Sequence, residues 1–201
     1  MQLFYSPTSP FVRKVLVVAH ELALTERIER LSAAAHPVNR DRTIIAFNPL
    51  GQVPTLLTEE GRILADSRVI CEYLNDLAGG ALFPPSGPAR WNALAEQSTA
   101  DGLLDAALLA RYERAVRPVD KLWPDWLEGQ IDKIHSALAA LEASARMFGD
   151  RVDIGTIASG CALSYLDLRF DDLDWRKRCP AAWDWYARFD ERPSMAATRL
   201  R

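Results

Sequence analysis

The segment 48–74, NPLGQVPTLLTEEGRILADSRVICEYL, constrains the fold more than any other part of the chain. Pro54 precedes the short apolar run Thr55–Leu57. Because proline donates no ladder hydrogen bond, it belongs at the start or edge of a strand. Glu60-Gly61 is a turn signal, and residues 62–64 alternate as a short returning strand. The segment therefore predicts a β-hairpin.

A helix is predicted directly after this hairpin. Either Asp66 or Ser67 can cap its N-terminus. Its apolar residues recur at helical spacing and form a predicted core stripe: Val69, Ile70, Tyr73, Leu74 and Leu77. The free N–H groups and the dipole at such a helix start favour a bound carboxylate. Ser67 therefore has two readings, a plain cap or a ligand contact, and one hydroxyl can serve both.

Three motifs make the whole chain resemble the soluble glutathione transferases, and in particular their bacterial YibF-like group. They are YSPTSPFVRK at 5–14, the segment 48–74 and RPSMAAT at 192–198. The resemblance implies an α/β thioredoxin-like N-terminal domain followed by an all-α C-terminal domain. It also implies a co-substrate, glutathione, and a second substrate that is a small electrophile.

The resemblance implies a glutathione-binding set in the N-terminal domain: Phe11, Gln52, Val53, Pro54, Asp66 and Ser67. In the family the peptide bond before the matching proline is cis, although only about 5–6% of X-Pro bonds are cis in general. A cis bond would turn the backbone of Val53 towards the cysteinyl backbone of glutathione, as in strand addition. Ser67 would receive the γ-glutamyl carboxylate.

The thiol-activating residue of the family lies in the turn between the first strand and the first helix. Ser9 is our first candidate, Thr8 the second and Tyr5 the third. A free thiol has a pKa of about 8.5, and lowering it by one unit requires about 1.4 kcal/mol of thiolate stabilisation. A hydroxyl that donates to sulfur beside a helix N-terminus stabilises the thiolate in this way. Ser9-Pro10 is also a good helix start, so Ser9 as a mere cap is the alternative.

Composition excludes several other classes of protein. The net charge of −3 and pI of about 5.7 leave no basic footprint for nucleic acid. No apolar run approaches the roughly 20 residues of a membrane span, and the N-terminus lacks the pattern of a secretion signal. The three cysteines and three histidines are scattered without metal-ligand spacing. We therefore expect a reduced, cytoplasmic protein without metal or prosthetic group.

The order of predicted elements in residues 1–78 is β-α-β-α-β-β-α, which is that of a thioredoxin-like domain. Residues 79–88 are rich in glycine and proline and predict a linker. Residues 89–201 predict an all-helical domain, and the resemblance implies that this domain carries the second-substrate pocket and the dimer contacts. Asp153 is expected to cap a helix there, although Thr156 is a poorer reciprocal partner than a carboxylate.

The first long helix of the helical domain, predicted at 89–116, carries three further candidates. Asp101 matches an acid that helps hold the γ-glutamyl amine in related transferases, sometimes across the dimer; a solvated surface acid is the alternative. Arg111 and Tyr112 are candidates for the second-substrate pocket. The spacing of Arg111, Arg114 and Arg117 equally predicts a solvated face that complements the helix dipole.

The resemblance thus predicts a homodimeric transferase that promotes attack of the glutathione thiolate on a small electrophile. Two alternatives remain open from the sequence. The same site could serve glutathione-dependent peroxide reduction or dehalogenation. The fold could also serve as a non-catalytic module that binds glutathione or another protein.

Overall fold

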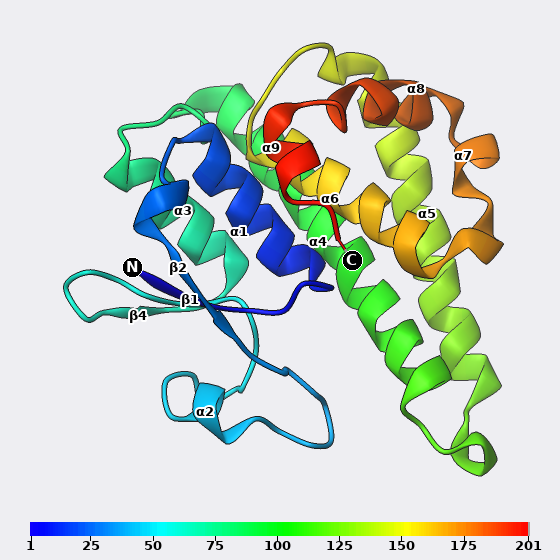
Figure 1. Cartoon of the computed structure of the whole chain (residues 1–201). Helices are drawn as coiled ribbons and strands as arrows, with labels where there is room; N and C mark the ends of the chain where they lie inside the picture. The colour runs from blue at the N-terminus through cyan, green and yellow to red at the C-terminus, as the bar shows by residue number, and fades with distance from the viewer. Residues whose placement is uncertain (201) are drawn as a thin grey trace. The chain divides into compact units, whose positions relative to one another are not determined.

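The computed structural model describes residues 1–200 and forms two compact units (Figure 1). The first contains Met1–Pro85 together with the segment that begins at Arg192, and the second contains Ser86–Glu191. The boundary at residues 85 and 86 falls within the predicted linker. The predicted assignment of the chain's end to the helical domain is wrong, because Arg192 and Ser194 hydrogen-bond Glu21 of the first unit.

The first unit is built on a four-stranded sheet of order β2-β1-β3-β4. The strands are β1 (Gln2–Tyr5), β2 (Glu29–Ser32), β3 (Thr55–Leu57) and β4 (Ile63–Leu64). β1 is parallel to β2 and antiparallel to β3, which is antiparallel to β4. Leu3 and Leu56, which face each other across β1 and β3, are fully buried and centre the core.

Helices cover both faces of this sheet. Figure 1 shows α1 (Pro10–Glu21) and α3 (Ser67–Leu77) on one face and α2 (Arg42–Ile45) on the other. A short 3₁₀ turn, η1 (Thr25–Arg27), leads into β2, and α9 (Pro193–Ala197) packs against α1. The predicted strands and helices of this unit are therefore present, with bounds that differ by a few residues.

The buried face of α3 differs from the predicted stripe at one position. Ser67, Ile70, Cys71 and Leu74 are buried, whereas Val69 is 47% exposed. A helix turns about 100° per residue, so positions i, i+3, i+4 and i+7 share one face and position i+2 lies on the opposite side. Val69 therefore lies on the side of α3 that is opposite the buried residues.

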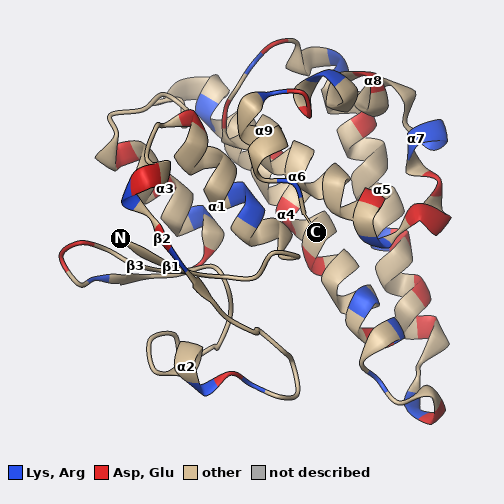
Figure 2. Ribbon diagram, in the orientation of Figure 1, with Lys and Arg blue, Asp and Glu red and all other residues tan. Residues whose placement is uncertain are grey.

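The second unit is helical. Its long helices are α4 (Gly87–Ala115), α5 (Pro124–Phe148) and α6 (Ile154–Arg169), and α4 packs against both of the others. The shorter elements are η2 (Val119–Lys121), η3 (Asp171–Leu173), α7 (Trp175–Arg178) and α8 (Pro180–Phe189). Basic and acidic residues are interspersed along α5, whereas the charged residues of α7 are all basic (Figure 2).

The start of α6 is capped more completely than the sequence predicts. Asp153 accepts hydrogen bonds from the backbone N–H groups of Gly155 and Thr156 at 2.9 and 3.1 Å. The Thr156 hydroxyl accepts in return from the N–H of Asp153 at 3.0 Å. The Thr156 hydroxyl thus accepts the reciprocal hydrogen bond of the cap, which a carboxylate usually accepts.

Within residues 1–200, no helix combines the length and the hydropathy that a bilayer crossing requires.

Candidate functional site

The sheet register brings three loops to one edge of the first unit. Phe4 of β1 is opposite Thr55 of β3, so the turn that follows β1 lies beside the segment that precedes β3. Leu64 at the end of β4 is opposite Leu56, so the loop from β4 into α3 reaches the same edge. Residues 6–9, 52–54 and 65–67 therefore meet at one end of the sheet, although they are far apart in sequence.

Ser9 lies in the first of these loops as the N-cap of α1. Its hydroxyl oxygen accepts a hydrogen bond from the N–H of Val12 at 3.3 Å. An oxygen that accepts at a cap keeps its own hydrogen for a further acceptor. Thr8 is oriented differently, because its hydroxyl lies 3.3 Å from the hydroxyl of Ser6. Ser9 is therefore a cap whose hydroxyl can still donate.

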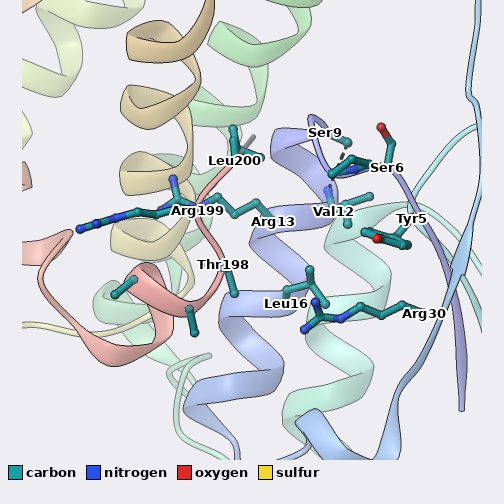
Figure 3. A pocket seen from close by; sticks show the side chains of 13 residues that line it. Tyr5, Ser6, Ser9, Val12, Arg13, Leu16, Arg30, Thr198, Arg199 and Leu200 are labelled. Atoms are coloured by element: carbon teal, nitrogen blue, oxygen red, sulfur yellow. Dashed lines mark hydrogen bonds between the residues drawn. The ribbon is translucent and has the colours of Figure 1, made fainter.

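A cavity of about 220 Å³ adjoins Ser9 (Figure 3). Its lining comes from β1, the following turn, α1, β2 and the end of the chain: Tyr5, Ser6, Pro7, Ser9, Val12, Arg13, Leu16, Arg30 and 196–200. Thr8 is absent from this lining, whereas Tyr5, the third candidate, belongs to it. Of the two leading candidates for thiol activation, only Ser9 faces the cavity.

The second loop contains a cis peptide bond between Val53 and Pro54, the geometry that the resemblance implies. Asn48 holds the loop, since its side-chain nitrogen donates to the Thr55 hydroxyl at 2.9 Å and its side-chain oxygen accepts from Leu50 N–H at 3.0 Å. The carbonyl of Gln52 accepts from the Thr55 hydroxyl at 2.7 Å. Within residues 1–200, neither the N–H nor the C=O of Val53 has a hydrogen-bond partner. A short extended peptide could therefore pair with this backbone.

The third loop leads into α3, where Asp66 rather than Ser67 is the N-cap. Asp66 is exposed and accepts from the N–H of Arg68 at 2.8 Å. Ser67 is the first residue of the helix and only 2% exposed. Within the described chain its hydroxyl has no hydrogen-bond partner. Because capping is done by Asp66, the Ser67 hydroxyl is available to a ligand.

The two remaining members of the predicted glutathione set border these loops. Phe11 is the second residue of α1 and is half-buried. The side chain of Gln52 is exposed, next to Val53. Both therefore lie within the loops that the sheet register gathers at this edge.

The candidates on α4 lie in the second unit and differ in their surroundings. Asp101 is completely buried, so the expectation of a solvated surface acid is wrong, while Asp105 one turn later is exposed. Arg111 and Tyr112 are half-buried. Burial raises the pKa of Tyr112 by more than the neighbouring Arg111 lowers it.

The predicted row of arginines on α4 is largely paired. Arg114 forms an ion pair with Asp172 at 3.1 Å, and Arg117 forms one with Glu113 at 2.6 Å. These contacts stabilise the end of α4 and do not leave a continuous cationic face. Across residues 1–200, no group of three or more histidine, cysteine or acidic side chains is arranged to hold a metal ion.

Two parts of the cavity wall were not predicted from the sequence. Arg30 projects from the edge strand β2, and residues 196–200 return to the first unit from the far end of the chain. The position of Arg30 follows only from the register of β1 against β2, in which Leu3 is opposite Arg30. That register joins strands far apart in sequence, so local patterns do not reveal it. The motif at 192–198 pointed to a closing helix but not to its position.

Comparison with known proteins gives two matching family models. Residues 8–77 match the N-terminal domain of glutathione S-transferases, and residues 124–188 match their C-terminal domain. The GST-like protein YibF of Escherichia coli strain K12 is 37% identical over 174 residues, which are 84% of this chain and 83% of that protein.

Solved structures include a glutathione transferase family member from Pseudomonas fluorescens Pf-5 with bound glutathione. Its TM-score is 0.97 at 44% identity, and the match covers 100% of this chain and 98% of that one. A second structure, with bound S-(propanoic acid)-glutathione, has a TM-score of 0.92 at 43% identity and covers both chains fully. With both domain models matched and relatives this similar over nearly the whole length, the chain belongs to the glutathione S-transferase family.

Proposed function

We propose that the first unit binds glutathione and promotes attack of its thiolate on a small electrophile. The proposal is carried by one observation: three groups with unused hydrogen-bonding capacity meet at one end of the sheet. These are the Val53 backbone, the buried Ser67 hydroxyl and the Ser9 hydroxyl. Each matches a different part of glutathione: the cysteinyl backbone, the γ-glutamyl carboxylate and the thiol. The Pseudomonas relative with bound glutathione supports this assignment.

Binding and activation follow from the chemistry of these groups. The cysteinyl N–H and C=O pair with Val53 as an added strand would. The γ-glutamyl carboxylate accepts from Ser67 at the N-terminus of α3, where the helix dipole favours negative charge. Ser9 donates its hydroxyl hydrogen to the sulfur and so favours the thiolate over the thiol. Phe11 and Gln52 border the bound peptide.

The chemical step is a nucleophilic substitution or addition at an electrophilic carbon. The thiolate sulfur forms a C–S bond. In a substitution a leaving group departs with the electron pair of the bond that breaks; in an addition the π bond breaks and its electron pair takes up a proton from solvent. Bringing both reactants into one site lowers the entropic part of the barrier. The relative with bound S-(propanoic acid)-glutathione supports a site that accepts a substituent on sulfur. Neither a metal nor a prosthetic group takes part in this scheme.

The test is a calorimetric titration with glutathione, followed by turnover assays with a panel of electrophiles. Ser67→Ala should weaken glutathione binding about tenfold, because a hydrogen bond to a charged group contributes roughly 1.5–3 kcal/mol. Ser98→Ala, which removes an exposed serine of α4, is the matched control and should bind like wild type. Equal affinity in the Ser67 variant and the wild type would remove Ser67 from the site. Tight binding without turnover of any electrophile would favour the binding-module alternative.

We further propose a cytoplasmic homodimer. The cysteines Cys71, Cys161 and Cys179 are buried thiols, which suits a reducing compartment. The dimer is expected from the family resemblance, and α4, which exposes Trp91, would supply much of the interface. Light scattering at micromolar concentration should give twice the mass of the chain, and a monomer mass would contradict the dimer.

A further inference from the structure

The charged side chains that line the cavity beside Ser9 are all basic. Three arginines contribute to its wall, Arg13, Arg30 and Arg199, and among the described residues that line it there is no aspartate or glutamate. A concave site lined by charges of one sign attracts ligands of the opposite sign. The cavity volume of about 220 Å³ suits a small molecule.

Arg30 is the arginine that stands apart from the protein's own interactions. It lies on the edge strand β2, opposite Leu3, and its side chain extends towards Leu16 and Thr198 (Figure 3). Within residues 1–200 it has no hydrogen-bond or ion-pair partner. By contrast, Arg13 donates to the carbonyl of Met195 at 3.0 Å. The guanidinium of Arg30 is therefore exposed at the cavity without a carboxylate from the protein.

Such a guanidinium suits a carboxylate. Arginine presents a planar fork of donors that matches the two oxygens of a carboxylate. Around it the wall alternates between hydroxyl groups, from Ser6 and Ser9, and short apolar groups, from Val12 and Leu16. The lining thus offers polar groups for an acid and apolar surface for a short carbon chain.

We infer that the second substrate is a small anionic electrophile whose carboxylate is bound by Arg30 in this cavity. The inference rests on the proposed function, because Ser9, the proposed thiolate donor, borders the same cavity. Arg30 reaches the cavity beside Leu16, seven residues or roughly 10 Å along α1 from Ser9, so the acid needs a chain of several carbons between its carboxylate and the carbon that meets the sulfur. The acceptor is thereby selected by its charge as well as by its reactive carbon.

An acid with a terminal halogen, such as 6-iodohexanoate, illustrates the chemistry with balanced bonds. The thiolate sulfur attacks the carbon that carries the halogen and forms the C–S bond. The carbon–halogen bond breaks, and the halide leaves with its electron pair. The carboxylate does not react, so the product is an S-carboxyalkyl glutathione that keeps its contact with Arg30.

The kinetic experiment compares two electrophiles that differ in charge but share a leaving group and a chain length, 6-iodohexanoate and 6-iodohexanamide. With the uncatalysed rate subtracted, the ratio of their kcat/KM values measures selection of the acid. Arg30→Gln should lower this ratio about three- to tenfold, a moderate effect because the guanidinium is partly exposed to solvent. Arg62→Gln is the matched control. It removes the same charge from an exposed residue at the hairpin turn, the opposite end of β4 from Ser67, and should leave the ratio unchanged.

A binding experiment provides an independent arm that does not need turnover. Calorimetry with S-(5-carboxypentyl)-glutathione and S-(5-carbamoylpentyl)-glutathione compares an acid and an amide of the same size. The wild type should bind the acid more tightly, and Arg30→Gln should remove that preference while it leaves glutathione affinity unchanged.

The outcomes separate the inference from the function on which it rests. If both electrophiles turn over but neither the kinetic nor the binding preference for the acid depends on Arg30, the inference is overturned and the transferase function stands. If neither electrophile turns over above background, the proposed function fails. A preference for the acid that Arg30→Gln abolishes would then still assign the cavity to an anionic substituent on sulfur.

Discussion

At the scale of single residues, Ser9 combines a structural and a chemical task in one hydroxyl. Its oxygen accepts from Val12 and caps α1, while its hydrogen is free to reach a sulfur atom. Ser9→Ala should therefore raise the pKa of bound glutathione towards its free value. The loss of turnover should be largest at neutral pH and should shrink as pH rises, because ordinary ionisation then supplies the thiolate. The absorbance of the thiolate, titrated with pH, measures the shift directly.

Two variants separate the tasks of this turn. Ser9→Gly removes the hydroxyl but keeps most of the capping, since glycine costs only a few tenths of a kcal/mol at an N-cap. It should lose thiol activation with little loss of stability. Thr8→Ala should leave the thiolate titration unchanged, because Thr8 pairs with Ser6 and does not line the cavity. If only Thr8→Ala moved the titration, the assignment of Ser9 would be wrong.

The residue scale also shows where sequence reasoning fails. The sequence predicted the positions of Ser9 and Ser67 because local capping chemistry and motif spacing place them. It could not choose between Asp66 and Ser67 as the cap, and it left open whether Asp101 is a solvated surface acid. Both questions depend on tertiary burial, which a helical repeat does not reveal.

At the scale of elements, the start of α6 is fixed by the reciprocal cap between Asp153 and Thr156. Asp153→Ala should destabilise the fold by roughly 0.5–2 kcal/mol, the usual loss for an N-cap, and should leave glutathione affinity unchanged. Denaturant unfolding measures the first and calorimetry the second. Asp153→Asn is the control, because asparagine caps as well but cannot form the ion pair with Arg151 at 3.2 Å. If Asn were as damaging as Ala, the ion pair rather than the cap would be the source of stability.

The packing of α6 against α4 requires a residue without a side chain at position 155. A Cβ atom on Gly155 would lie 2.9 Å from the carbonyl oxygen of Ala93, closer than packed atoms allow. Gly155→Ala should therefore force the two helices apart and cost about 1–3 kcal/mol. Gly129→Ala on α5, where a Cβ would meet nothing within 4 Å, should instead be neutral or stabilising. Thermal unfolding of both variants distinguishes the two environments.

At the scale of the whole molecule, the first unit is made from both ends of the chain. The element order of residues 1–78 and the all-helical region could be predicted, because hydrophobic periodicity, proline and glycine positions carry that information locally. The return of the C-terminal segment could not. It depends on long-range contacts with α1, where the half-buried carboxylate of Glu21 pairs with Arg192 and Ser194 and Arg13 donates to the carbonyl of Met195. Nothing local to residues 192–200 predicts these partners.

That carboxylate makes the docking of the last segment sensitive to acid. Arg192 donates twice to Glu21, at 3.1 and 3.0 Å, and Ser194 donates to the same group. Burial raises the pKa of Glu21, but the hydrogen bonds from Arg192 and Ser194 together lower it by more. The pKa of Glu21 therefore lies below its ordinary value of 4.5. Because this pKa is depressed, the contact stabilises the folded state at pH values above the ordinary pKa of a glutamate side chain. That contribution is lost as pH falls through the folded pKa.

Hydrogen exchange of the peptide 192–200 should therefore accelerate in acid, after correction for the intrinsic pH dependence of exchange. Glu21→Gln should exchange faster already at neutral pH, because the neutral amide cannot replace the charged acceptor, and it should lose most of the acid effect. Glu59→Gln is the control, since Glu59 pairs with Arg27 at the exposed hairpin and does not touch this segment. Acid-accelerated exchange that persisted unchanged in Glu21→Gln would show that another group holds the segment. Because residues 196–200 also line the cavity beside Ser9, a loosened segment should weaken binding of S-(5-carboxypentyl)-glutathione along with its own protection.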